Sequence, residues 1–186
     1  MPVELSFLKR LDTPQAKQLA KKLPAAWFKG MVREVLKMEN VGAGVWTIAC
    51  VDDPAMTQVH GRSMGLFTTT DVLTFDLRAP LAKRAGLAGA ATSLGAGAGP
   101  NGGAEVPPSS HIELDTVICL DEAARQADIR GHELNREVLL YSIHSLLHVC
   151  GYDDRKTTDA RRMHRREDEI LVALGVGAVF ERPLKR

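Results

Sequence analysis

The sequence lacks any continuous apolar run near the roughly 20 residues that a membrane-spanning helix requires. Its first residues interrupt their apolar positions with Glu4, Lys9 and Arg10 and offer no small-residue cleavage site, so they do not resemble a signal peptide. A membrane span is excluded, and we expect the chain to stay in the cytoplasm.

Cysteine is scarce. Cys50, Cys119 and Cys150 form an odd number without a CxxC pair, and two of them lie inside apolar runs. Thiols in such runs usually pack as small hydrophobic groups. We therefore expect reduced cysteines in the core.

The chain also lacks a strong excess of charge of either sign. Its formal net charge is +1, so the overall field does not favour nucleic-acid binding. The distribution is uneven, because residues 1–40 contain eight Lys or Arg and four Asp or Glu, and eight minus four leaves this part basic by four.

With 186 residues, 45% of them hydrophobic and 25% charged, the chain has the size of one domain with a buried core. We expect one domain over residues 1–186. Within it, residues 79–110 are mostly Gly, Ala, Pro and Ser with few large side chains to bury, which predicts a flexible insertion that carries no site.

Hydrophobic periodicity predicts four strands and about five helices. Segments rich in alternating or β-branched residues indicate strands at 3–8, 44–51, 70–77 and 114–120, the first of them at a sheet edge. Apolar spacing of three and four residues, with capping residues and prolines, indicates helices at 14–38 with a break or kink at Pro24, 54–64, 121–128 with Asp121 as N-cap, 134–150, and 158–174 with a charged outer face.

The range 134–150 is apolar on most sides, which predicts a helix buried nearly all round. It contains His144 and His148, one helical turn apart, so both imidazoles project from one face at the separation that two ligands of one metal require. Taken alone, the pair also suits histidines that only form hydrogen bonds in the core.

The residues after this helix favour the metal interpretation. Gly151 permits a left-handed turn that ends the helix and brings Asp154 back toward the histidines. Two imidazoles and one carboxylate leave a coordination position open for water, which is the pattern of catalytic rather than structural zinc. Such a metal makes water more acidic and acts as a Lewis acid on a phosphoryl or carbonyl oxygen. A site at the end of the central helix therefore indicates an enzyme.

Four neighbouring residues fit this set less well. Ser145 stands where HExxH zinc proteases have their glutamate base, which argues against peptide hydrolysis. Asp153 suits a helix N-cap and a solvated turn. His164, the reserve third ligand, lies among four arginines and is typical of a surface residue. Cys150 falls on roughly the opposite side of the helix from the histidines.

The segment HSLLHVCGYDD, residues 144–154, resembles the HGxLHLxGYDH signature of the YbeY family of bacterial endoribonucleases. Three further segments resemble family stretches in the same order: TDVLTF at 70–75 (PTDVLSF), LDTVIC at 114–119 (LGDIVIC), and VWTI at 45–48 followed by Asp52 (VTIRIVD). The likeness covers about residues 45–174 apart from the insertion, and four ordered segments are far more specific than a histidine pair.

This resemblance implies an α+β fold with a small mixed sheet flanked by helices. It matches His144 and His148 to two zinc ligands and places Asp154 where the family has its third histidine. It also implies single-stranded RNA as substrate, maturation of the small-subunit ribosomal RNA 3′ end, and contact with the small ribosomal subunit and its assembly factors. DNA and membrane partners are not expected.

Two departures from the family pattern bear on the chemistry. Met64 stands where the family usually has an arginine thought to serve catalysis, so a cation suited to a phosphate is missing. Arg62 is the candidate substitute, although two helical steps turn it away from that direction. Asp154 in place of a neutral histidine lowers the charge of the site by one, and two histidines with a carboxylate also suit Fe²⁺ or another divalent metal besides Zn²⁺.

The leading hypothesis is a metal-dependent endoribonuclease whose His144, His148 and Asp154 hold the catalytic metal. A ribosome assembly factor that retains the fold and metal without cleavage is the alternative, favoured by Met64, and a metallopeptidase is disfavoured by Ser145.

Further residues have both a functional and a structural interpretation. Asp71 and Asp115 are candidates either for orienting ligands or for capping strand ends. Lys17, Lys21 and Lys29 are candidates either for contacts to an RNA backbone or for solubility.

Overall fold

The computed structural model describes residues 2–78 and 111–180, so the predicted insertion lies outside the described residues. Along the chain its elements are β1 (Glu4–Arg10), α1 (Pro14–Ala20), α2 (Ala25–Met38), β2 (Ala43–Val51), α3 (Asp53–Met64), β3 (Val72–Asp76), β4 (His111–Cys119), α5 (Leu120–Arg130), α6 (Leu134–Val149) and α7 (Thr157–Ala173). The expectation of one domain over residues 1–186 stays a prediction.

The four strands form one mixed sheet in the order β1-β2-β4-β3. β1 and β4 both run parallel to β2, and β3 runs antiparallel to β4 along the other edge. The predicted α+β class, the mixed four-stranded sheet and the edge position of the first strand are therefore confirmed.

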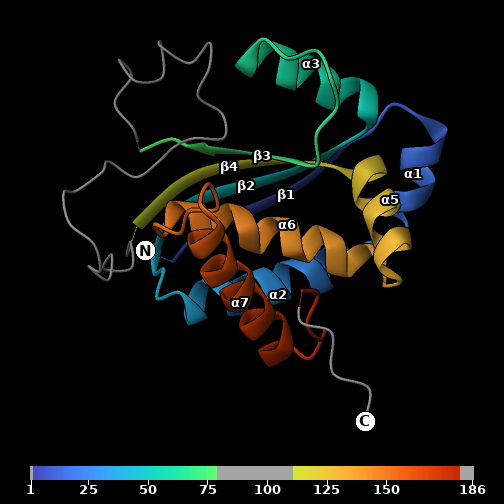
Figure 1. The fold of residues 1–186 in the computed structure, drawn as a ribbon. Coiled ribbons are helices and arrows are strands. Elements are labelled where there is room, and N and C mark those ends of the chain that lie inside the picture. Colours follow the sequence, from blue (N-terminus) through green and yellow to red (C-terminus); the bar gives the residue numbers. More distant parts are fainter. Residues whose placement is uncertain (1, 79–110, 181–186) are drawn as a thin grey trace.

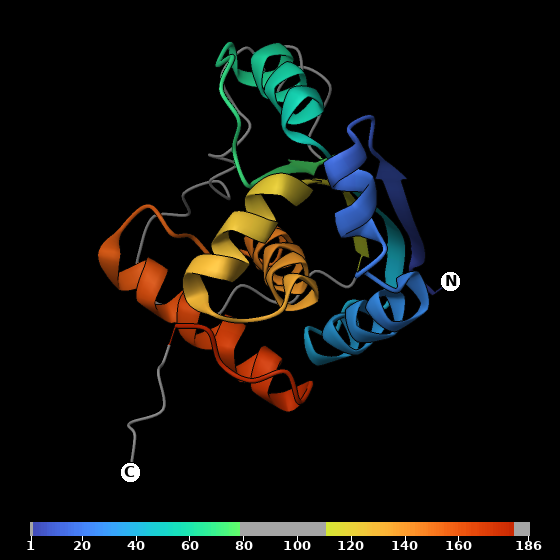
Figure 2. The ribbon, with the colours of Figure 1, turned by 90° about the vertical axis from the view of Figure 1, so that its right-hand side faces the viewer.

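Helices cover both faces of the sheet, with α6, α7 and α2 on one side and α3 on the other (Figure 1). The alternation of side chains along β4 explains this arrangement. Leu114 and Ile118 point into the larger core, which includes α6, whereas Val117 and Cys119 pack with Met56 of α3 in a smaller cluster. Seen along α6, the sheet curves around that helix (Figure 2).

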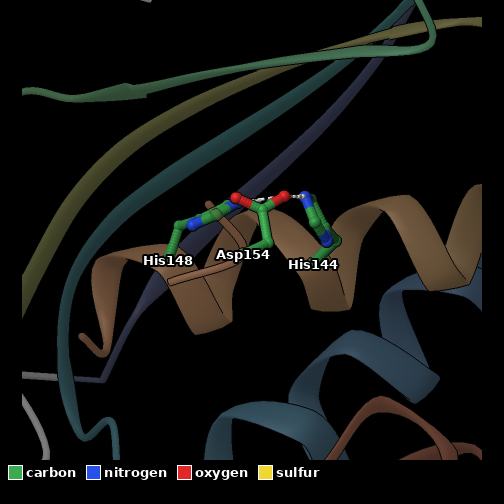
Figure 3. A group of neighbouring side chains, drawn as sticks. All are labelled: His144, His148 and Asp154. Atoms are coloured by element: carbon green, nitrogen blue, oxygen red, sulfur yellow. Dashed lines mark hydrogen bonds and ion pairs between the residues drawn. The ribbon is translucent and has the colours of Figure 1, made fainter. Parts of the chain in front are cut away.

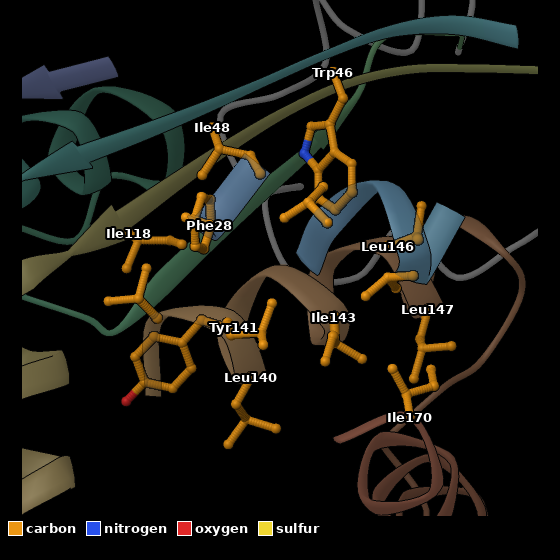
Figure 4. Close-up of a cluster of buried hydrophobic side chains, with 14 of the residues drawn as sticks. Phe28, Trp46, Ile48, Ile118, Leu140, Tyr141, Ile143, Leu146, Leu147 and Ile170 are labelled. Atoms are coloured by element: carbon orange, nitrogen blue, oxygen red, sulfur yellow. The ribbon is translucent and has the colours of Figure 1, made fainter. Parts of the chain in front are cut away.

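The larger core lies between the sheet, α2 and α6 (Figure 4). Trp46 of β2 is fully buried there, and its indole N–H donates to the Thr116 hydroxyl at 3.0 Å, which satisfies the one polar atom of the ring. Leu139, Ile143 and Leu146 of α6 are likewise fully buried. The prediction that this helix is surrounded by protein is confirmed, so its side chains have fixed directions.

Most differences from the predicted elements are shifts of a few residues. The break at Pro24 is real and separates α1 from α2, so the described residues contain six helices rather than about five. The prediction that Asp121 caps α5 was wrong, because the helix begins at Leu120 with Cys119 as its N-cap. The Asp121 carboxylate instead accepts the backbone N–H of Asp53 at 2.9 Å and ties the start of α3 to the start of α5.

The described part of the chain holds no helix of the length and apolar character that crossing a bilayer would take.

Gly44 is the glycine on which the pairing of β2 with β4 depends. Its φ is 121°, and a Cβ there would overlap the carbonyl oxygen of Ile112 on the paired strand. We expect Gly44→Ala to lower the free energy of unfolding by about 3 kcal/mol, because it combines strain with a backbone clash. Gly30→Ala on α2, where no atom lies within 4 Å of the new Cβ, should raise that free energy by about 0.5–1 kcal/mol. Urea denaturation measures both, and equal midpoints for Gly44→Ala and the parent would contradict this account.

Candidate metal centre

The centre is built by the last turn of α6 and the chain reversal that follows it. After α6 ends, Gly151 adopts a φ of 93°. Its N–H donates to the carbonyl of His148 at 3.1 Å, and the N–H of Tyr152 donates to that of Leu147 at 3.0 Å, which is the Schellman arrangement. The predicted glycine turn is confirmed, and it returns the chain so that Asp154 lies over the two histidines (Figure 3).

The three side chains converge on one point. One ligand atom from each of His144, His148 and Asp154 lies within 4.8 Å of the others. The two Nε2 atoms are 2.9 Å apart, and Oδ2 of Asp154 is 3.8 Å from each of them. The imidazoles are mostly buried, with exposed fractions of 23% and 21%, whereas the carboxylate is 38% exposed.

The other nitrogen of each imidazole has a fixed acceptor. Nδ1–H of His144 donates to Oε1 of Glu167 at 2.8 Å, and Nδ1–H of His148 donates to the carbonyl of Tyr152 at 3.2 Å. Because a carboxylate and a carbonyl only accept, both rings carry a proton on Nδ1, and the lone pairs of both Nε2 atoms are directed at the common point. Carboxylate and carbonyl partners of this kind are typical of histidines that ligate metals.

Two lone pairs facing each other at 2.9 Å repel unless a proton or a cation lies between them. Burial lowers the pKa of His148, and the neighbouring His144 lowers it further. Burial also acts to lower the pKa of His144, but the hydrogen bond and charge of Glu167, together with the charges of Asp154 and Asp71, raise this pKa overall. In the metal-free protein the first proton therefore belongs to His144 and is donated to His148.

Glu167 is the functional residue that the sequence analysis missed. The charged outer face predicted for the last helix does not include it, because its side chain is fully buried. A signal was present: Glu167 stands four residues after Met163 and three before Ile170, both on the apolar inner face of α7. A carboxylate on that stripe needs a buried partner, and His144 is that partner.

The remaining candidates near the centre lie outside the group of three. Asp153 accepts the N–H groups of Asp154 and Arg155, which confirms the solvated turn, but the N-cap of α7 is Lys156, so the capping prediction was wrong. His164 stacks on Phe180, with ring centroids 4.0 Å apart. The three cysteines are free and buried, as predicted, and Cys150 packs in the larger core.

Asp71 and Asp115 turn out to differ in position. Asp71 lies close enough to His144 for its charge to raise the pKa of that imidazole. Its carbonyl also accepts the N–H of Cys119 at 2.8 Å and joins the start of β3 to the end of β4. Asp115 stands two residues before Val117 and therefore lies on the same face of β4, which packs toward α3 and away from α6.

Met64 is partly buried against the smaller core cluster, and Arg62 is exposed in the last turn of α3. Of the three lysines considered for RNA contact, Lys17 lies on α1, Lys21 is the C-cap of α1 and Lys29 lies on α2. α1 packs against α5, at the opposite end of α6 from the histidines (Figure 1). Lys17 on that helix donates to the carbonyl of Asp12 at 2.9 Å.

Fold and site together define the class: an α+β protein with a candidate centre of two imidazoles and one carboxylate at the end of its central helix. The chain belongs to the YbeY family, because the family model described as "Endoribonuclease YbeY" matches residues 11–175.

Curated relatives with that name align over most of the chain. The one from Geobacillus thermodenitrificans is 27% identical over 177 residues, covering 95% of this chain and 99% of the relative. The one from Bacillus cereus is 30% identical over 156 residues, covering 81% and 88%. The one from Desulforamulus reducens is 33% identical over 129 residues, covering 68% and 69%. A solution structure of a Thermotoga maritima protein aligns with 98% of this chain and 99% of its own at 18% identity and a TM-score of 0.48.

The charge of Asp154 raises the pKa of both imidazoles. We expect Asp154→Asn to move the titration midpoints of His144 and His148 in the metal-free protein to lower pH, because the anion that favours their protonated forms is lost. Asp128→Asn, at an exposed position of α5, should leave both midpoints in place. Long-range proton–nitrogen NMR spectra recorded against pH give the midpoints. Unchanged midpoints in Asp154→Asn would contradict the proximity of the Asp154 carboxylate to both imidazoles.

Proposed function

We propose that this protein is a metal-dependent endoribonuclease specific for single-stranded RNA, in which His144, His148 and Asp154 hold the metal. Membership of the YbeY family and the names of its relatives support the reaction class. The observation that carries the metal assignment is the pair of Nε2 atoms aimed at one point while both Nδ1 atoms are engaged by Glu167 and the carbonyl of Tyr152.

The donor set fits a small divalent ion. Zinc–nitrogen bonds of about 2.0–2.1 Å in tetrahedral geometry place adjacent ligand atoms about 3.3 Å apart. The distances of 2.9 Å between the nitrogens and 3.8 Å from each nitrogen to the carboxylate lie on either side of that value, so small rotations of the side chains suffice. We propose Zn²⁺ as the metal, with Fe²⁺ as the alternative that the same ligands suit.

A divalent ion at this point supplies a Lewis acid for a phosphoryl oxygen and a more acidic water. The protein's own contribution is orientation. Glu167 and Tyr152 keep a proton on each Nδ1, and Asp154, the most exposed of the three ligands, borders the side from which substrate arrives. Ser145 is fully buried and accepts a hydrogen bond from Thr74 at 2.8 Å, so no carboxylate base stands at that position, and the proposal is confined to RNA.

The proposed setting follows from the family resemblance. The substrate is the 3′ end of the small-subunit ribosomal RNA, and the partners are the small ribosomal subunit and its assembly factors in the cytoplasm.

A second candidate function is a ribosome assembly factor that keeps the fold and the metal but does not cleave. The observation that favours it is Met64, which packs its side chain against the smaller core cluster where the family resemblance calls for an arginine. The two candidates differ in cleavage and agree in metal content.

Purified protein loaded with Zn²⁺ should cleave a single-stranded RNA oligomer and leave a duplex of the same sequence intact. His148→Ala should slow cleavage at least about 100-fold, because one ligand is lost, and a chelator should abolish cleavage until metal is restored. Denaturing gels measure all three. Full metal content without cleavage would support the second candidate function, the assembly factor. Equal cleavage rates for the parent and His148→Ala would refute the metal-dependent nuclease.

Glu167→Gln should weaken zinc binding by about 10- to 100-fold, as expected when the partner of a ligating histidine loses its charge. Glu169→Gln, on the same helix but 52% exposed, is the matched control and should bind zinc like the parent. Competition against a chromophoric chelator gives the affinities. Identical affinities for both variants would contradict a role for Glu167 in orienting His144.

A further inference from the structure

Phe67, in the loop between α3 and β3, is the most exposed aromatic side chain of the described residues. Its exposed fraction is 74%. Phe180 is the other exposed phenylalanine of the described residues, at 38%, and its ring stacks on His164. An exposed phenylalanine contributes little to stability, because its apolar surface stays in water. The ring of Phe67 therefore presents an uncovered aromatic surface that the fold does not need.

The loop nevertheless holds this ring in place. Gly61 of α3 is buried, and a Cβ there would overlap the Cδ1–Cε1 edge of Phe67, so the ring is seated on bare helix backbone. The carbonyl of the next residue, Thr68, accepts a hydrogen bond from Nδ1–H of the buried His60 at 2.7 Å. The hydroxyl of Thr69 then donates to Asp53 at 3.2 Å. A ring fixed in this way loses little conformational freedom when a ligand covers it.

The same loop leads directly to the candidate metal centre. Three residues lie between Phe67 and Asp71, so their Cα atoms are four chain steps and at most about 14 Å apart. The charge of Asp71 acts on His144, and Thr74 of β3 contacts Ser145 beside it. Both ribbon views show the loop descending from α3 to the start of β3 (Figures 1 and 2). β3 is an edge strand of the sheet and contacts α6.

We propose that Phe67 is a stacking platform for an unpaired nucleobase of the RNA whose backbone occupies the metal centre. The inference rests on the proposed function and adds a substrate contact to it. Single-stranded RNA is commonly held by bases stacked on aromatic side chains, and a paired base has no free face to offer. Phe67 and the neighbouring Leu66, 54% exposed, form too small a surface for a stable protein interface.

Binding to fluorescein-labelled single-stranded RNA, followed by anisotropy in the full-length His148→Ala background to prevent cleavage, tests the proposal. Phe67→Ala should bind about 5- to 150-fold more weakly, which is the range expected for one lost stacking contact. Phe67→Tyr should bind like Phe67. Ile129→Ala removes an equally exposed apolar side chain, 76% exposed on α5, and should change nothing. Circular dichroism confirms that each variant is folded.

A second probe, a sugar-phosphate chain of the same length without bases, should bind the protein that has Phe67 and the Phe67→Ala variant with equal affinity. Equal affinities of both proteins for the base-containing RNA, or full retention of affinity in Phe67→Leu, would overturn the stacking contact and leave the nuclease proposal standing. If neither the His148→Ala background nor the zinc-loaded protein with His148 intact binds or cleaves single-stranded RNA, both proposals fall.

Discussion

The hydrogen bond from His144 to the buried carboxylate of Glu167 is the interaction on which the candidate site depends. A fully buried carboxylate is costly unless a donor or a positive charge compensates it. Oε1 has the imidazole, and Oε2 has no hydrogen-bond partner among the described residues. A cation held by His144 on the other side of the ring would offset the remaining cost. The same contact clamps α7 onto α6 and fixes the direction of the ligand atom.

The local part of this arrangement could be predicted from the sequence because it lies within eleven residues. Helical spacing places His144 and His148 on one face, and Gly151 reverses the chain toward Asp154; each step follows from backbone geometry alone. The strands and helices were also accessible from their periodicity.

The contacts between distant segments could not be predicted in this way. Glu167 stands 23 residues beyond His144 in a segment full of charges, and only the packing of α7 shows that it points inward. Asp121 looks like a helix cap in the sequence, but a partner on α3 competes for its carboxylate. In both cases a tertiary contact decided between two local roles for the same side chain.

The segment from Met64 to Asp71 contains one of the two departures from the family's pattern, Met64, together with the exposed Phe67. The position expected to carry a cation is part of a small apolar cluster, and three residues later an anchored phenylalanine is exposed to solvent. We infer that the segment still serves the RNA but contacts a base instead of a phosphate. Its hydrogen bonds to α3 and its continuation into β3 keep it in a constant position relative to the histidines.

X-ray absorption spectroscopy of the zinc-loaded protein is the most direct test of the proposed centre. The account predicts a first shell of nitrogen and oxygen atoms at about 2.0–2.1 Å, with the outer-shell scattering of two imidazole rings. A sulfur atom in the first shell, or the signature of fewer than two imidazoles, would contradict it.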